Sequence, residues 1–162
     1  MKIWMIAFLL TLSNNLLAQS KIAGHYRNHF FSDIQLKSDG TFEYNWYHHF
    51  YGSWTKGTWW SRGDTVYFHV VPMYDTLSII KNGKSADSLI LSKYSNPRRV
   101  TLQQLTEVTI QSIEQNRIVL PDKMVFKENK LYEIKDGRLV TEKRIVNKRG
   151  SESDPWYFKS DE

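Results

Sequence analysis

The sequence predicts an all-β fold in which an antiparallel meander closes into a barrel, with one short helix and a C-terminal hairpin. Apolar and polar residues alternate through much of the chain, as they do in strands with one buried face. Turn dipeptides separate the alternating runs, namely Asp39-Gly40, Asn82-Gly83 and Asp136-Gly137. The 162 residues include no cysteine, so a packed core must stabilise the fold without disulfide bonds.

The first 18 residues have the pattern of a secretory signal peptide. Lys2 precedes an apolar run from Ile3 to Leu12, and Leu16-Leu17-Ala18 supplies a small residue for cleavage. The run is too short for a permanent membrane-spanning helix, which needs about 20 residues. The alternative to a signal peptide is a buried N-terminal helix. We therefore expect an exported protein, periplasmic or extracellular, with one barrel domain over 19–146 and a polar tail over 147–162.

The residues after the leader predict the first strands of the barrel. Short strands are expected at Ile22–Arg27 and Ile34–Lys37, followed by a long strand at Thr41–Tyr51 and a turn at Gly52. Side chains alternate across a sheet, so the even positions of the long strand should face the interior. These even positions are Phe42, Tyr44, Trp46, His48 and Phe50.

Four further strands are expected to continue the meander. They span Ser53–Ser61, Thr65–Val71, Asp75–Lys81 and Ser88–Ser92, at the short regular spacing of a sandwich or barrel. Gly57 lies inside the first of these strands, where a glycine suggests a bulge or a tight bend.

The second half of the chain is less regular. Residues 100–116 contain no glycine or proline and place leucines on one helical face, which favours a helix, but the alternation of residues 107–111 favours a strand. The β pattern resumes at residue 117 with a hairpin at Asp136-Gly137. The aromatic cluster Pro155–Phe158 is expected to dock over an open end of the barrel, with a partner-binding motif as the alternative.

Four short motifs in the first half resemble those of a known group. They are Gly24-His25-Tyr26, the run LKSDGTFEY from Leu36 to Tyr44, Gly57-Thr58-Trp59 and Gly63-Asp64-Thr65-Val66. Together they resemble the small exported, lipocalin-like envelope proteins of the Bacteroidetes type. The resemblance covers residues 22–92 and implies a lipocalin-like barrel. It also implies a binding or envelope role, with ligands that differ between members. The second β-rich segment departs from the lipocalin plan, which has a single terminal helix there.

Aromatic residues are the strongest functional signal, with nine of them between Asp39 and Thr65. Small barrels can hold one ligand in the mouth. We therefore predict that a small apolar or amphipathic molecule binds to Tyr44, Trp46, His48, Trp60, Tyr67 and His69. In one alternative the aromatics simply fill the barrel. In another, an outer platform contacts an envelope protein or a glycan through Tyr47, Tyr51, Trp54 and Trp59.

The sequence contains no recognisable catalytic or metal-binding constellation. His48 and His49 are adjacent on an expected strand and would point to opposite faces, and no HExxH motif is present. A Gly-x-Ser-x-Gly elbow, a thiol nucleophile and a glycine-rich phosphate loop are also missing. The formal charge of +5 is scattered along the chain without a nucleic-acid-binding module. We therefore predict a non-catalytic binding protein with no metal, cofactor or nucleic-acid partner; its oligomeric state stays open.

Overall fold

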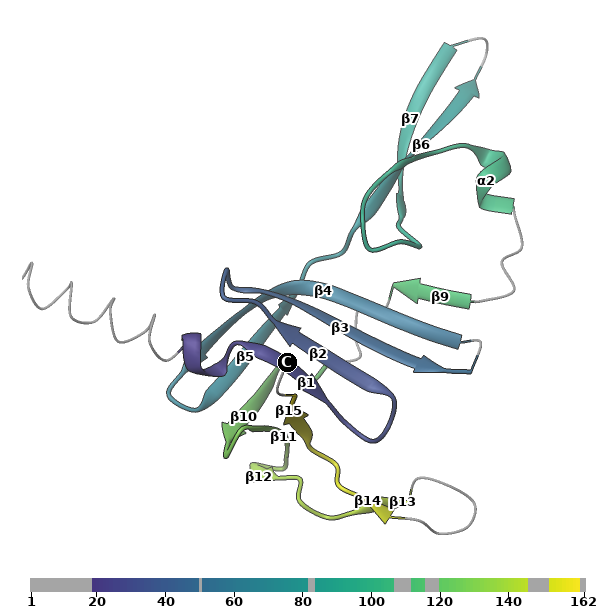
Figure 1. The fold of residues 1–162 in the computed structure, drawn as a ribbon. Coiled ribbons are helices and arrows are strands. Elements are labelled where there is room, and N and C mark those ends of the chain that lie inside the picture. Colours follow the sequence, from purple (N-terminus) through teal and green to yellow (C-terminus); the bar gives the residue numbers. More distant parts are fainter. Residues whose placement is uncertain are drawn as a thin grey trace, which may run out of the picture.

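The molecule is built around a closed antiparallel barrel of eight strands (Figure 1). This confirms the predicted fold class, an all-β barrel with little helix. The computed structural model describes residues 19–49, 51–81, 84–106, 112–115, 120–145 and 152–160. Around the barrel the strand order is β10-β5-β4-β3-β2-β1-β15-β11, and β11 pairs with β10 to close the ring. The barrel strands are β1 (Gly24–Arg27), β2 (Ser32–Leu36), β3 (Thr41–His48), β4 (Tyr51–Arg62), β5 (Thr65–Val70), β10 (Lys123–Lys127), β11 (Lys130–Lys135) and β15 (Tyr157–Lys159).

The other elements lie outside the ring. A separate three-stranded sheet of β7, β6 and β8 projects from the barrel as an arm, with α2 beside it (Figure 1). Strand β9 pairs in parallel with the start of β4, β12 pairs with β11, and β13 pairs with β14. Their bounds are β6 (Tyr74–Lys81), β7 (Lys84–Leu91), β8 (Arg99–Val100), α2 (Leu102–Thr106), β9 (Ser112–Gln115), β12 (Arg138–Leu139), β13 (Arg144–Ile145) and β14 (Glu152–Ser153).

Two of the turn dipeptides are found where they were predicted. Gly40 joins β2 to β3 with a φ of 82°, and Gly137 joins β11 to β12 with a φ of 72°. Both values are in the left-handed region, which glycine enters without a Cβ clash. The dipeptide at residues 82–83 lies outside the described residues, although the strands on either side of it do pair.

The predicted turn at Gly52 is wrong. His48 pairs with Tyr51, so the chain reverses between these two residues, and Gly52 is already inside β4 opposite Tyr47. His49 adopts a φ of 54°, one of the few left-handed conformations of a non-glycine residue here. The turn is thus shorter and earlier than the position of the glycine suggests.

Gly57 lies where strands β4 and β5 approach each other closely. Each neighbouring strand supplies one partner, Phe42 on β3 and Val70 on β5, so the register contains no bulge at this point. A Cβ built on Gly57 would overlap the backbone carbonyl oxygen of His69 and lie 2.8 Å from the Phe42 ring. Only glycine lets β4 run this close to β5.

Side chains fill the barrel interior. Phe42 and Tyr44 are buried, as the even-face prediction requires, and Trp46 packs against the same cluster. Phe42 meets Phe68 edge to face, with ring centroids 5.2 Å apart. The side chain of His48 and the whole of Phe50 lie outside the described residues. The buried cluster consists of Ile22, Tyr26, Ile34, Leu36, Phe42, Tyr44, Trp59, Val66, Phe68, Leu120, Met124, Phe126, Leu131 and Tyr157.

The second half of the chain differs from the expectation in two places. The aromatic cluster near the C-terminus was expected to dock over an open barrel end, but Tyr157–Lys159 forms a barrel strand between β1 and β11. The inward side chain of Tyr157 is buried, which explains an apolar cluster in a polar segment. Residues 100–116, for which helix and strand were both open, contain both, with α2 first and then β9.

Candidate functional site

A stacked pair of aromatic rings lies on the outer face of the barrel. Trp60 on β4 and Tyr67 on β5 are cross-strand partners whose ring centroids are 5.5 Å apart with planes at 9°. The neighbouring pair, Trp59 and Phe68, points inward and is buried. Alternation therefore fixes the outward direction of the stack, and Trp60 remains 48% exposed.

A hollow adjoins this stack on the same face. Thr58 lies two residues before Trp60, pairs with His69, and lines the hollow, whose volume is about 330 Å³. This size lies at the lower end of the range for small-ligand sites. The lining residues come from the β2–β3 turn, from β3 and β4, and from the segment after β5: Lys37, Thr41, Phe42, Glu43, Lys56, Gly57, Thr58, Val71 and Met73.

The polar groups in the hollow are both cationic and anionic. Lys56 Nζ lies 3.4 Å from Glu43 Oε2, and both side chains are 23% exposed. The nearby Asp39 carboxylate accepts bonds from the Thr41 hydroxyl at 2.6 Å and the Thr41 amide at 2.8 Å. These hydrogen bonds hold the pKa of Asp39 below its usual value. The hollow thus presents two ammonium groups, a carboxylate and hydroxyl groups on the face that carries the aromatic stack.

Backbone contacts anchor one wall of the hollow. The Val71 amide donates to the Lys56 carbonyl at 2.9 Å, which extends the β4–β5 pairing by one residue. The Gln115 side chain then binds both backbone groups of Met73, accepting from its amide at 2.8 Å and donating to its carbonyl at 2.9 Å. Gln115 also donates to the Ser92 carbonyl at 3.2 Å, so one amide side chain ties the wall to the arm. Sequence reasoning missed this role, because nothing local marks a glutamine as a clamp.

The six residues predicted to form a ligand site do not gather in one place. Trp60, Tyr67 and His69 lie together on the outer face of β4 and β5. Tyr44 is 4% exposed inside the barrel, and Trp46 packs beside it. The side chain of His48 lies outside the described residues.

The predicted outer platform is also divided. Tyr47 and Tyr51 are exposed, but Trp54 and Trp59 are buried. Trp59 points into the barrel and donates its indole N–H to the Lys37 carbonyl at 2.9 Å. Trp54 points outward yet is covered, and its indole N–H donates to the Lys93 carbonyl at 3.2 Å. The segment that follows β7 therefore shields Trp54 from solvent.

The tyrosines inside the barrel form a neutral hydrogen-bonded group. The Tyr44 hydroxyl donates to Ser32 Oγ at 3.3 Å. Burial raises the pKa of Tyr44 and that of Tyr157 beside it, which keeps both phenols protonated. Such satisfied, neutral groups are the usual way in which polar atoms are accommodated in a core.

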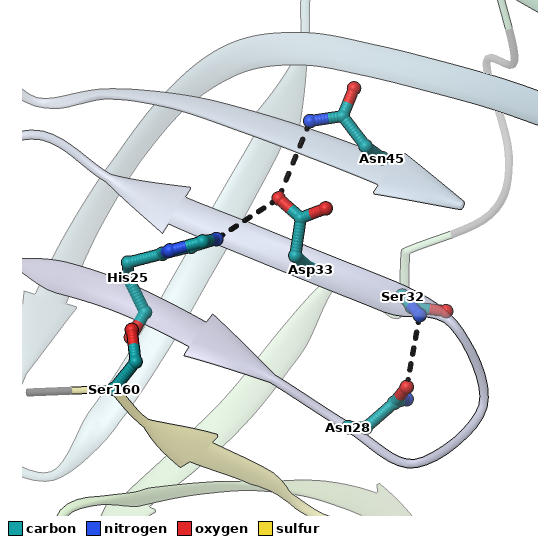
Figure 2. Close-up of polar contacts among 6 residues, drawn as sticks. All are labelled: His25, Asn28, Ser32, Asp33, Asn45 and Ser160. Atoms are coloured by element: carbon teal, nitrogen blue, oxygen red, sulfur yellow. Dashed lines mark hydrogen bonds and ion pairs between the residues drawn. The ribbon is translucent and has the colours of Figure 1, made fainter. Parts of the chain in front are cut away.

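A second polar cluster crosses the outer face of β1, β2 and β3 (Figure 2). Asp33 Oδ2 lies 3.2 Å from His25 Nε2 and accepts a bond from the Asn45 amide at 3.4 Å. Ser160 is also close, but its hydroxyl donates to the backbone carbonyl of His25 at 3.2 Å and not to the imidazole ring. Serine, histidine and aspartate are thus near one another without the hydroxyl-to-imidazole bond that activates a nucleophile. The cluster ties three strands together.

Among the residues that the structure describes, no group of three or more histidine, aspartate or glutamate side chains could hold a metal ion. Over the same part of the chain, no helix has the length and apolar character needed to cross a membrane. Comparison with models of known families, with curated proteins and with solved structures found no match.

Proposed function

We propose that this is an exported, non-catalytic binding protein that holds a glycan on the outer face of β3, β4 and β5. The exposed stack of Trp60 on Tyr67 carries this proposal, together with the hollow on the same face, which Thr58 lines two residues before Trp60. The flat C–H face of a sugar ring packs well on an aromatic ring, which offers a large, rigid apolar surface. Hydroxyl, ammonium and carboxylate groups in the hollow can bind the sugar hydroxyls.

The packing of the interior is the reason to propose the outer face. A small apolar or amphipathic ligand inside the barrel would have to displace side chains such as Tyr44 and Phe42, which are 4% and 2% exposed. Moving Tyr44 would break its hydrogen bond to Ser32 and leave buried hydroxyl groups without a partner. The desolvation cost of those groups would then be added. The outer hollow needs no such rearrangement.

Export and family remain part of the same proposal. The leader at residues 1–18 supports secretion to the periplasm or beyond, where glycans of the envelope are the available partners. The motifs between residues 22 and 92 support a lipocalin-like relationship. An envelope protein as partner would use the same exposed rings and becomes an outcome of the test below.

The test is a titration of residues 19–162 with a panel of soluble polysaccharides, in which isothermal calorimetry measures the affinity. Trp60→Ala should weaken binding at least about tenfold, the effect of losing one aromatic hot spot. Tyr51→Ala is the matched control, because Tyr51 is 65% exposed and lies nine residues away along β4. Equal affinity of the Trp60 variant and the wild type would refute the proposal.

A separate measurement addresses the interior. Native mass spectrometry of the protein purified from its own source would reveal a small molecule that co-purifies in stoichiometric amount. Such a molecule, lost in Trp46→Ala but retained in Trp60→Ala, would move the binding site into the barrel. Retention of a glycan fragment that depends on Trp60 would support the outer face.

A further inference from the structure

We propose that the bound glycan is anionic, bearing carboxylate or sulfate groups; this inference rests on the proposed glycan-binding function. The outward strand positions around the aromatic stack are rich in cations. Arg62 follows Trp60 by two residues on β4, and Lys123 on β10 is the direct cross-strand partner of Tyr67. Both cations are exposed, and neither makes an ion pair with another described residue.

The hollow adds two more cations to the same face. Lys37 and Lys56 line it, one at the β2–β3 turn and one on β4. The stack is therefore flanked on the β10 side by Lys123, at the β4–β5 turn by Arg62, and on the hollow side by lysines. Flanking cations at several points suit a chain of acidic sugars, because each repeat can place a negative group near one of them.

Two carboxylates near these cations already have partners, and two more are exposed at the rim of the face. Glu43 is the acidic residue at an outward strand position here, and its partner is Lys56. Asp39 lies in the β2–β3 turn, where its carboxylate is bonded to Thr41. Asp64 and Asp122 are exposed in the segments before β5 and β10, beside the cationic positions. The outward strand positions thus carry three cations, Lys56, Arg62 and Lys123, to one carboxylate, Glu43. The β2–β3 turn adds one charge of each sign, Lys37 and Asp39.

Single-stranded nucleic acid would use related chemistry, but the arrangement of the rings favours a glycan. Nucleic acids bind to aromatic side chains on which successive bases stack along a basic groove. Here Trp60 and Tyr67 cover one face of each other, so the pair provides one platform instead of a series. A single platform beside a polar hollow fits one sugar ring with its substituents.

The experiment compares four probes at two salt concentrations: dextran, polygalacturonate, dextran sulfate and oligothymidylate. We expect polygalacturonate or dextran sulfate to bind at least about tenfold more tightly than dextran at low salt, with the difference reduced by screening at high salt. The double variant Arg62→Gln/Lys123→Gln should lose this preference and keep the affinity for dextran. The charge-matched control, Lys135→Gln/Arg138→Gln, changes two exposed cations of the β11–β12 hairpin and should keep the preference.

Each outcome decides between the two proposals or refutes both. Equal binding of dextran and the acidic polymers, lost in Trp60→Ala, would overturn the anionic inference and retain glycan binding. An equal loss in the control double variant would also overturn it, since net charge alone would then explain the effect. Tighter, Trp60-dependent binding of oligothymidylate would replace the glycan by nucleic acid. Failure of all four probes to bind would overturn both the inference and the proposed function.

Discussion

Two adjacent tryptophans should have opposite roles, which makes them the sharpest test of the structure. Trp59 is 2% exposed in the barrel core, and its indole N–H satisfies the Lys37 carbonyl. Truncating a buried tryptophan to alanine costs about 3–5 kcal/mol. The lost hydrogen bond adds about 1 kcal/mol. Trp60 is 48% exposed and loses mainly its stack on Tyr67, so Trp60→Ala should cost only about 1–2 kcal/mol.

Urea unfolding followed by far-ultraviolet circular dichroism measures both costs, because a single domain of this size usually unfolds in two states. Since domains have a total stability of about 5–15 kcal/mol, Trp59→Ala could leave too little folded protein to measure. Trp59→Phe keeps a ring and removes the N–H, and should cost about 1–2 kcal/mol. Binding should show the reverse order, with a defect in Trp60→Ala and none in Trp59→Phe. Destabilisation of the two alanine variants within 1 kcal/mol of each other, on the order of the measurement error, would refute the inward and outward assignment.

Two further predictions concern stability. Gly57→Ala should destabilise the barrel by about 2–4 kcal/mol, because its Cβ would overlap the His69 backbone. A Cβ on Gly63 meets no atom within 4 Å, but this residue has a φ of 60°, so Gly63→Ala should cost about 1–2 kcal/mol in the same urea assay. Equal costs for the two glycine variants would contradict the close approach of β4 and β5 at Gly57. Burial raises the pKa of Tyr157, so the folded state favours the neutral phenol. This contribution is complete below the unfolded tyrosine pKa of about 10 and is lost as the pH rises beyond it. Between pH 9 and 12, roughly the range over which unfolded tyrosine titrates, the free energy of unfolding of Tyr157→Phe should therefore fall less than that of the wild type. The same fall in both proteins would argue against a buried Tyr157 hydroxyl.

The sequence predicts local pairing well, because a hairpin is specified by its own turn and strands. The turns at Asp39-Gly40 and Asp136-Gly137 are examples, since their glycines adopt the left-handed conformation that the turn requires. Long-range pairing has no such local code. The β6–β7 hairpin alternates like the barrel strands but forms the arm, and β15 pairs with a strand more than a hundred residues earlier in the chain. The choice between these partners depends on the whole core.

The candidate site shows how one turn changes the prediction for several residues. A turn centred on Gly52 would pair even with even positions and place Trp60 inside with Tyr44. The actual reversal pairs Trp46 with Ser53, so odd positions of β4 face inward and Trp59 replaces Trp60 in the core. A shift of one residue reverses every side chain of a strand. Tyr67, the partner of Trp60, consequently lies outside as well.

The position of β15 determines when the barrel can form. Tyr26 pairs with Lys159, and the Lys159 ammonium reaches the Lys21 carbonyl across a separation of 138 residues. Closing a loop of this length costs roughly 4 kcal/mol in chain entropy, and contacts between distant residues slow folding. Without Tyr157–Lys159 the sheet is open, and its edges are β1 and the first residues of β11, Lys130 and Leu131. Closure of the barrel therefore waits for residues 157–159, which follow the first strand by more than a hundred residues.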